Sequence, residues 1–532
     1  MAGLSRRQLM TSALLAAGAP FALAACAPGS EGAAARSTGA GAAKQLALQF
    51  VGPPVSLNPA LGSAGRSATY LALAYDPLIY LAGDGTLVPD LATKWGFVGE
   101  GNTVFELTLR DGVTFHDGSP MDATAVVNSI KYFLGSGGGQ RSYAGPIQTV
   151  EASGASTVRI TYSSPYPFAP TSLTQFYGIG LIIGPKGLAD PKKLLSSSDG
   201  TGQYTYDAGG SVTNSSYHYV RNPTYWNPSA QLYDAMTVKI IGDPGAVLSA
   251  IRTGQVALAD GSRDTVDAAR SAGLAVQEPM FFTWTLVLAD RGGTLCKPLA
   301  DPRVRQAIGY AFDRAAMAKA LGGDHLVPNG QINLPGTSGF VEGGGFTTDL
   351  AKAKQLLQQA GYPDGFEMPI VAETVLDANA TLAQAVSSAL GQIGIKAPLK
   401  VVSTGIGQFS QEATSKKYPA VFFPIAGTDT GAVAQQIMVS TGGLFDPWAD
   451  VDPQAQALLR QAATTDDTAQ QKALHEKASA RLIDVGWVVP LFTQKSLIYV
   501  SKSITNVKTS TLNPNPIPVG PAKEYAWQPA GS

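Results

Sequence analysis

Two histidines of the sequence are each followed directly by a carboxylate residue, a pairing that proton-transfer catalysis uses. His116 and Asp117 precede Gly118, and because Asp-Gly is turn chemistry we expect a structural loop there. His475 and Glu476 lack the second histidine of a metalloprotease helix, so we expect a solvated helical face. The four histidines are widely separated. The sequence therefore predicts no metal site.

Motifs for nucleotide and acyl chemistry are missing from the sequence. It holds no G-x-x-x-x-G-K-[ST] loop, no G-x-S-x-G elbow and no C-x-x-C pair. We therefore predict a protein that is not an enzyme and needs no cofactor, and any ATP hydrolysis must belong to a partner. The formal net charge is −1, which does not suggest nucleic acid as a partner.

The N-terminus has the pattern of an export signal that ends in a cysteine. Arg6 and Arg7 precede an apolar run that is too short to span a bilayer. The run closes on Leu23-Ala24-Ala25-Cys26, which resembles the bacterial lipobox. We predict a signal peptide over residues 1–25, with a twin-arginine-like start, and a lipid on Cys26. An ordinary signal peptide cut at the Ala-rich stretch is the alternative.

Residues 26–44 are rich in Ala, Gly and Ser, without an apolar period, and are predicted to form a flexible tether. The predicted location is the extracytoplasmic face of the cell membrane, with the lipid anchor holding the protein there. If Cys26 carries lipid, Cys296 has no disulfide partner and is expected to be a buried small residue.

The remaining sequence alternates between strand and helix patterns. An apolar run at 46–51 predicts a buried strand, and Phe105, Leu107 and Leu109 share one face of another strand. Further strands are predicted at 157–162, 217–220, 236–241 and 488–492, and helices are predicted to begin after Asp122, Asp301, Asp313, Asp349 and Asp452. This order indicates mixed α/β domains.

Several segments resemble family 5 of the solute-binding proteins of ABC importers, the oligopeptide, dipeptide and nickel-binding type. They follow the family's order over about residues 45–500. The matching segments are Leu57-Asn58-Pro59, Tyr75-Asp76-Pro77-Leu78, Pro89–Trp95, Phe105–Val126, Thr201–Tyr204, Arg221–Trp226, Ala300–Ala307 with Asp313-Arg314, and Ala351–Pro363.

The resemblance implies a type II periplasmic-binding-protein fold, α/β in class, with two lobes, an interlobe cleft and an extra N-terminal α/β subdomain. The implied parts are lobe I at 45–70, 196–278 and 490–532, the subdomain at 71–195, and lobe II at 279–489. It also implies capture of a solute, foremost an oligopeptide, and its delivery to ABC permease and ATPase subunits. We expect a monomer.

Two residues are candidates for ligand binding. Trp284 lies where the chain should enter lobe II and could stack on a ligand. Asp429 lies where peptide-binding members place the carboxylate that pairs with a peptide's α-amine; a loop Asx turn is the alternative. Arg303, Arg305, Asp313 and Arg314 also cluster, and we expect them to form surface and interlobe ion pairs.

The sequence departs from the family around Asp429. The usual Trp and Asp-Pro context is replaced by Phe422–Ile425 and a Gly/Thr stretch, and no arginine lies between Arg314 and Arg460. Dipeptide binders use a lobe II arginine on the ligand carboxylate, so dipeptide specificity is disfavoured. A second hypothesis is a cell-envelope adaptor or regulator that binds a lipid or protein without transport. A third, an exported hydrolase, lacks a nucleophile–base–orienter set.

Overall fold

The computed structural model describes residues 44–62, 68–138, 140–425, 446–465 and 467–531, all within the unit spanning Ala43–Ser532. Strands in these ranges form three larger sheets and two short ribbons. Within the same ranges, no helix has the length and apolar character needed to span a membrane.

The first lobe is built on a seven-stranded sheet in which β1 (Gln45–Phe50) is an inner strand. β1 confirms the predicted first strand and pairs in parallel with β10, from Gln45↔Ala235 to Phe50↔Ile240. Its alternate residues Leu46, Leu48 and Phe50 are buried in a Tyr-rich core. The sheet order is β12-β19-β11-β1-β10-β9-β8. Its other strands are β8 (Tyr204–Val212), β9 (Ser216–Arg221), β10 (Ala235–Ile240), β11 (Leu258–Asp260), β12 (Ala275–Gln277) and β19 (Ile498–Val500). The helices of this lobe are α5 (Pro244–Arg252) and α6 (Val266–Ser271).

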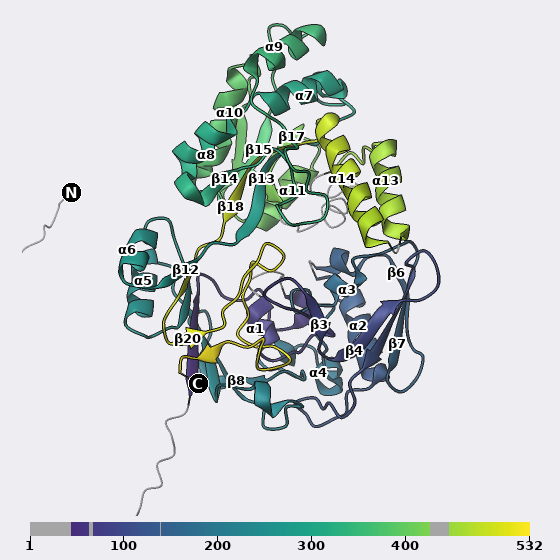
Figure 1. Cartoon of the computed structure of the whole chain (residues 1–532), viewed down its shortest axis with the longest axis vertical. Helices are drawn as coiled ribbons and strands as arrows, with labels where there is room; N and C mark the ends of the chain where they lie inside the picture. The colour runs from purple at the N-terminus through teal and green to yellow at the C-terminus, as the bar shows by residue number, and fades with distance from the viewer. Residues whose placement is uncertain (1–43, 63–67, 139, 426–445, 466, 532) are drawn as a thin grey trace, which may run out of the picture. The chain divides into compact units, whose positions relative to one another are not determined.

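The second lobe is built on a six-stranded sheet of order β14-β18-β13-β17-β15-β16. Its strands are β13 (Met280–Leu288), β14 (Leu326–Pro328), β15 (Ile370–Glu373), β16 (Leu399–Val402), β17 (Ala420–Ile425) and β18 (Val488–Lys495). Figure 1 shows the helices packed around it, namely α7 (Pro302–Tyr310), α8 (Arg314–Gly322), α9 (Leu350–Gln359), α10 (Thr381–Gly391), α11 (Ile406–Thr414), α13 (Pro453–Thr464) and α14 (Thr468–Asp484). The predicted N-caps of α7, α8, α9 and α13 are confirmed, because each aspartate accepts a backbone N–H from the first turn.

The subdomain is a four-stranded antiparallel sheet covered by one long helix. Its order is β4-β5-β7-β6, with β4 (Ala92–Phe97), β5 (Val104–Leu109), β6 (Ile147–Ala152), β7 (Thr157–Tyr162) and the covering helix α2 (Ala123–Gly135). Phe105, Leu107 and Leu109 are buried under α2, so the predicted face of β5 is confirmed.

The described ranges also contain shorter elements outside the three larger sheets. They are α1 (Thr69–Ala72), β2 (Ile79–Leu81), β3 (Leu87–Pro89), α3 (Ala169–Ser172), α4 (Pro185–Ala189), β20 (Ile504–Thr505) and β21 (Gln528–Pro529).

A buried acidic pair lies where the subdomain meets the first lobe. Asp76 is 5% exposed and accepts hydrogen bonds from the Thr201 hydroxyl and the Trp226 indole, both at 3.2 Å, and from Tyr225 OH at 3.4 Å. The nearby Asp90 is 1% exposed. Burial raises the pKa of Asp76, and burial together with the charge of Asp76 raises the pKa of Asp90.

We predict that this pair makes the folded state less stable as the pH rises. A raised native pKa means that the protonated carboxyl stabilises the fold below the ordinary aspartate value of about 3.9, and this contribution is lost as pH rises through the raised value. One such group lowers the free energy of unfolding by at most about 1.4 kcal/mol per pH unit. Urea unfolding between pH 5 and 8 should show a smaller decline for Asp76→Asn than for the wild type.

Asp111→Asn is the matched control, because it makes the same change at an exposed aspartate of the subdomain. It should keep the wild-type pH dependence. An unchanged decline in Asp76→Asn would show that Asp76 is ionised in the native state.

Candidate functional site

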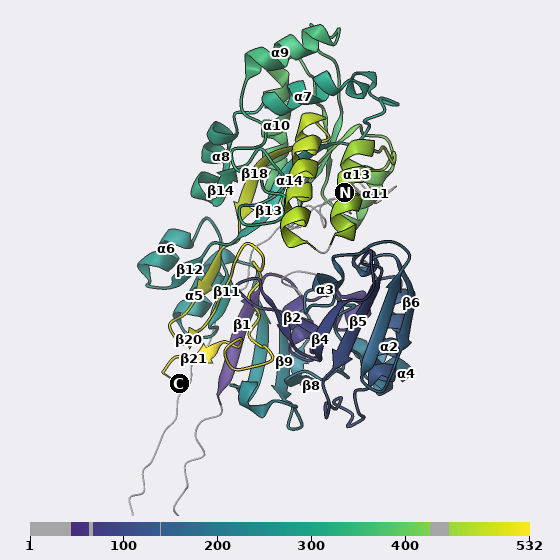
Figure 2. The same ribbon diagram turned by 45° about the vertical axis from the view of Figure 1, so that its right-hand side comes forward.

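The chain crosses between the two lobes twice, and the two crossings lie side by side. Glu278 and Pro279 lead from β12 to β13, and Ser496 and Leu497 lead from β18 to β19. Figure 2 shows β13 and β18 descending together toward the strands of the first lobe. Ser496 N–H donates to the Pro279 carbonyl at 2.9 Å. The second lobe can therefore rotate about two short connections while both sheets stay intact.

Glu278 connects charges of both lobes at this crossing. Its carboxylate accepts from the Arg270 guanidinium of α6 and lies 3.4 Å from Lys495 Nζ at the end of β18. The three side chains are partly exposed, so each ion pair contributes at most about 1 kcal/mol. β18 stays in the six-stranded sheet to Lys495, so the chain leaves that sheet later than the predicted boundary at residue 490.

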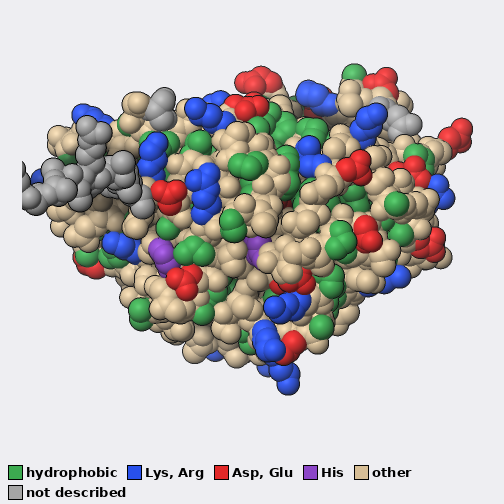
Figure 3. Space-filling view, turned by 90° about the horizontal axis from the view of Figure 1, so that it is seen from below, with side chains coloured by type: hydrophobic (Ala, Val, Ile, Leu, Met, Phe, Trp, Pro, Cys, Tyr) green, Lys and Arg blue, Asp and Glu red, His purple; other side chains and the backbone are tan. Residues whose placement is uncertain are grey.

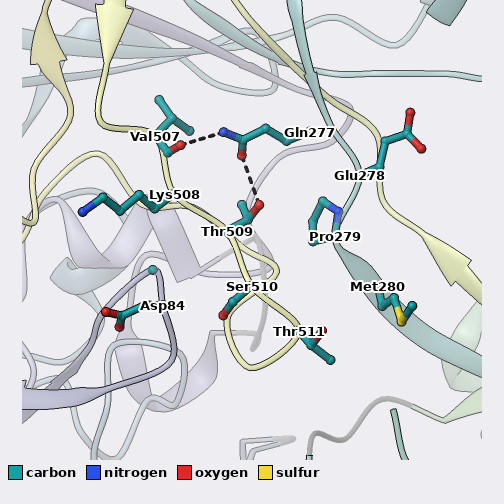
Figure 4. Close-up of a pocket in the computed structure, with 11 residues that line it drawn as sticks. Asp84, Gln277, Glu278, Pro279, Met280, Val507, Lys508, Thr509, Ser510 and Thr511 are labelled. Atoms are coloured by element: carbon teal, nitrogen blue, oxygen red, sulfur yellow. Dashed lines mark hydrogen bonds between the residues drawn. The ribbon is translucent and has the colours of Figure 1, made fainter. Parts of the chain in front are cut away.

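A pocket of about 660 Å³ opens beside the crossing, a size within the range of small-molecule sites. Three segments line it: the crossing itself, the loop after β20, and the turn between β2 and β3 (Figure 4). The lining residues are Gly83, Asp84, Gln277, Glu278, Pro279, Met280, Val507, Lys508, Thr509, Ser510 and Thr511.

The Gln277 side chain fixes one wall of the pocket. Its Nε2 donates to the Val507 carbonyl at 2.6 Å, and the Thr509 hydroxyl donates to its Oε1 at 3.2 Å (Figure 4). The turn before β3 approaches the same loop closely, because a Cβ on Gly83 would lie 2.6 Å from Lys508 Cβ. These contacts hold the C-terminal loop against the crossing.

The pocket is lined by hydroxyls, by the acids Asp84 and Glu278, and by one base, Lys508. Thr509, Ser510 and Thr511 line one side, with Asp84 and Lys508 at the rim. Hydrogen bonds from the Thr86 N–H and hydroxyl, and then the nearby charge of Lys508, lower the pKa of Asp84. Such a surface suits a polar or zwitterionic solute. In the described ranges, no group of three or more His, Cys, Asp and Glu is arranged to hold a metal ion.

Trp284 lies in the core of the second lobe. The side chain is 0% exposed, its ring stacks on Phe422 at 5.3 Å, and Nε1 donates to Gln494 Oε1 at 2.8 Å. In this arrangement the ring leaves no surface for a ligand. Its contact with a ligand stays a prediction from the sequence. Asp429 and Cys26 lie outside the described residues, so their predicted roles also stay predictions.

Two arginines predicted in surface and interlobe ion pairs are buried instead. Arg314 is 5% exposed and donates to the carbonyls of Pro490, Phe312 and Gly309. Arg305 is 6% exposed and donates to the carbonyls of Val485 and Leu299. Burial lowers the pKa of Arg314 to about 9 and that of Arg305 to about 10. Carbonyl acceptors satisfy these guanidinium groups, which a helical pattern does not reveal. Arg303 does pair at the surface, with Asp301 at 2.6 Å.

The histidine predictions have opposite outcomes. His116 is structural as predicted: Asp117 accepts from the Ser119 backbone and hydroxyl in a turn, and the His116 ring lies 3.2 Å from the Gly202 carbonyl of the first lobe. His475 is not solvated, because it is 6% exposed and bonds to the Ser338 hydroxyl at 2.6 Å. Cys296 is buried as predicted, and burial raises its pKa to about 11.

Sequence reasoning missed the pocket residues. The run from Lys508 to Thr511 matches no motif and follows the second crossing by several residues. Hydrogen bonds of Thr509 and of the preceding Val507 to Gln277 place it beside the first crossing. The face shown in Figure 3 intersperses basic and acidic side chains, so no field of one sign marks a partner there.

Comparisons with known proteins agree with this architecture. The profile of the bacterial extracellular solute-binding proteins, family 5 middle, matches residues 86–447. The glutathione-binding protein GsiB of Pectobacterium atrosepticum is 24% identical over 482 residues, covering 87% of this chain and 91% of the relative.

Two solved structures share the fold over nearly their whole length. The periplasmic binding protein DppA from Helicobacter pylori, in complex with peptide STSA, has a TM-score of 0.74 at 21% identity, covering 91% of this chain and 98% of that one. NikZ from Campylobacter jejuni, in complex with Ni(L-His), has a TM-score of 0.72 at 20% identity, covering 91% and 99%. The predicted periplasmic-binding-protein fold is confirmed.

We predict that Gln277→Ala releases the loop at 507–511. Losing two hydrogen bonds should lower the free energy of unfolding by about 1–2 kcal/mol and speed hydrogen exchange of the loop amides. Gln277→Glu should act similarly, because it sets a carboxylate against the Val507 carbonyl. The control is Gln392→Ala, a change of an exposed glutamine in the second lobe. Unchanged exchange at 507–511 in both Gln277 variants would contradict this account of the wall.

Proposed function

The chain belongs to family 5 of the bacterial extracellular solute-binding proteins, and from this premise we propose that it captures an oligopeptide and delivers it to an ABC importer. It would contribute binding and release, while permease and ATPase subunits move the solute and hydrolyse ATP. The proposal needs no catalytic group in this chain.

The observation that carries the proposal is the pair of hydrogen-bonded crossings between the lobes. A capture protein must exclude water from its ligand and later release it, and two short connections permit both by rotation of one lobe. The polar pocket beside the crossings supports a solute that forms hydrogen bonds, as a peptide backbone does.

The ligand's charged ends are a separate part of the proposal. Asp429 is our candidate for the partner of a peptide α-amine, a charge-assisted contact of about 1.5–3 kcal/mol in a closed site. The ligand carboxylate has no arginine partner between Arg314 and Arg460. Arg314 itself is occupied by carbonyls. We therefore favour peptides longer than dipeptides, which can be held along their backbone.

We expect tri- and tetrapeptides to raise the melting temperature of the purified protein by several degrees. Ligand at a hundredfold excess over Kd adds about 2.7 kcal/mol of stability. The panel should also hold glutathione, dipeptides, sugars and nickel–histidine. N-acetylation of the best peptide should remove most of the shift if a carboxylate pairs with the α-amine, and Asp429→Asn should do the same.

Each outcome of this panel separates the hypotheses. A shift with nickel–histidine alone would replace the peptide with a metal chelate. No shift with any solute would count against transport binding and favour the adaptor or regulator hypothesis.

We also propose that a lipid on Cys26 holds the protein at the extracytoplasmic face of the membrane. In cells expressing the full chain, the wild type should sediment with membranes and require detergent for release. Cys26→Ser should move the protein to the soluble fraction, because the thiol is the acylation site. Cys296→Ser is the matched control and should remain with the membranes. A Cys26→Ser protein that still needs detergent would overturn the anchor.

A further inference from the structure

Away from the crossings, the subdomain contacts the second lobe through the side chain of Asn102. This residue lies in the loop between β4 and β5, and its Nδ2 donates to the Ala463 carbonyl at 2.9 Å. Ala463 belongs to the last turn of α13. That helix packs on the second lobe, where Ala455 joins the core around Val287 and Val488. The hydrogen bond therefore joins two bodies that the crossing strands leave free to rotate.

A second contact joins the first lobe to α8. Arg263 follows β11, and its Nη1 donates to the Leu321 carbonyl at 2.5 Å in the last turn of α8. Asp377 accepts backbone N–H groups at the start of α10, and burial raises its pKa while those hydrogen bonds and the charge of Arg263 partly offset the rise. Leu321 and Asp377 both belong to the second lobe.

The two contacts use the same chemistry. Carbonyls in the last turn of a helix have no partner within the helix and carry partial negative charge. In the described arrangement, the last turns of α8 and α13 each receive a donor from the opposite side. If the second lobe rotates away, both carbonyls return to water. The donors therefore stabilise the closed arrangement relative to an open one.

The Asn102 side chain is buried and fixed in the conformation that makes its contact, whereas the Arg263 side chain is exposed. Asn102 is 5% exposed, has a φ of 51° that asparagine tolerates, and accepts from Tyr166 N–H through its own carbonyl. Its amide therefore loses little conformational freedom on closure. Arg263 is an exposed, flexible side chain, so its contact should be weaker and screened by salt.

We propose that Asn102 and Arg263 are two latches that set how far the ligand-free protein is closed. If the ligand binds the closed form, its apparent Kd equals the intrinsic Kd divided by the closed fraction. The latches would then tune affinity without touching the ligand. This consequence for affinity rests on the proposed function, but the effect on closure does not.

Single-molecule energy transfer tests the latches without a ligand. Dyes on cysteines introduced at Glu151 of β6 and Lys354 of α9, both exposed, report the separation of the subdomain from the second lobe. The background is the full chain with Cys26→Ser; Cys296 is buried. Asn102→Asp sets a carboxylate against the Ala463 carbonyl, and Arg263→Gln removes the charge. The double variant should raise the ratio of open to closed molecules about 4- to 100-fold.

Conservative variants separate a latch from a folding defect. Asn102→Gly keeps the positive φ but loses the amide, so it should open the protein like Asn102→Asp. Arg263→Lys keeps the charge and a donor, so it should stay near the wild type. With a solute from the binding panel, Asn102→Asp should weaken affinity about 2- to 10-fold.

The outcomes for the two proposals are distinguishable. An unchanged distance distribution in the double variant, with a wild-type melting temperature, would overturn the latches. If no solute binds but the double variant opens, the latches stand and the proposed transport function fails.

Discussion

Each crossing between the two large sheets is two residues long, and the crossings are hydrogen-bonded to each other from Ser496 N–H to the Pro279 carbonyl. This pairing continues into β13 and β18, which are adjacent strands of the second lobe. Because the two crossings are short and bonded to each other, the two lobes rotate about one common axis. The pocket and the Glu278 ion pairs lie beside this axis. The contacts of Asn102 and Arg263 lie away from it, where rotation of the second lobe would separate them.

The rigid attachment of the subdomain to the first lobe concentrates motion at the two crossings. The subdomain is joined to the first lobe by buried polar contacts, including Asp76 with Thr201 and Trp226 and His116 with Gly202. Separating the subdomain from the first lobe would break all of these hydrogen bonds together, which costs more than losing a single one. The interlobe contacts of Asn102 and Arg263 are single hydrogen bonds. Rotation at the crossings is therefore the motion of lowest cost.

The buried arginines show how local pattern and tertiary environment diverge. On sequence, Arg305 and Arg314 have the spacing of a charged helical face. In the fold, each donates to carbonyls of distant residues, Val485 and Pro490, which belong to the last part of the second lobe. A guanidinium group has five donors and can be satisfied by carbonyls without a counter-ion. Helical periodicity records that a residue lies on a face, but it does not record what covers that face. The predicted solvated position of His475 is wrong for the same reason, because its side chain is buried.

Features that depend on neighbouring residues could be predicted from the amino-acid sequence. Aspartate caps predicted five helix starts, alternation predicted the buried face of β5, and the ordered motifs from Leu57 to Pro363 indicated the family. Tertiary structure alone decided that Gln277 meets Val507 and Thr509, that Trp284 is enclosed by Phe422 and Gln494, and that Asn102 reaches α13. These contacts join residues that are far apart along the chain. A periodic pattern reports burial against some partner, whereas the identity of that partner follows only from how the elements pack.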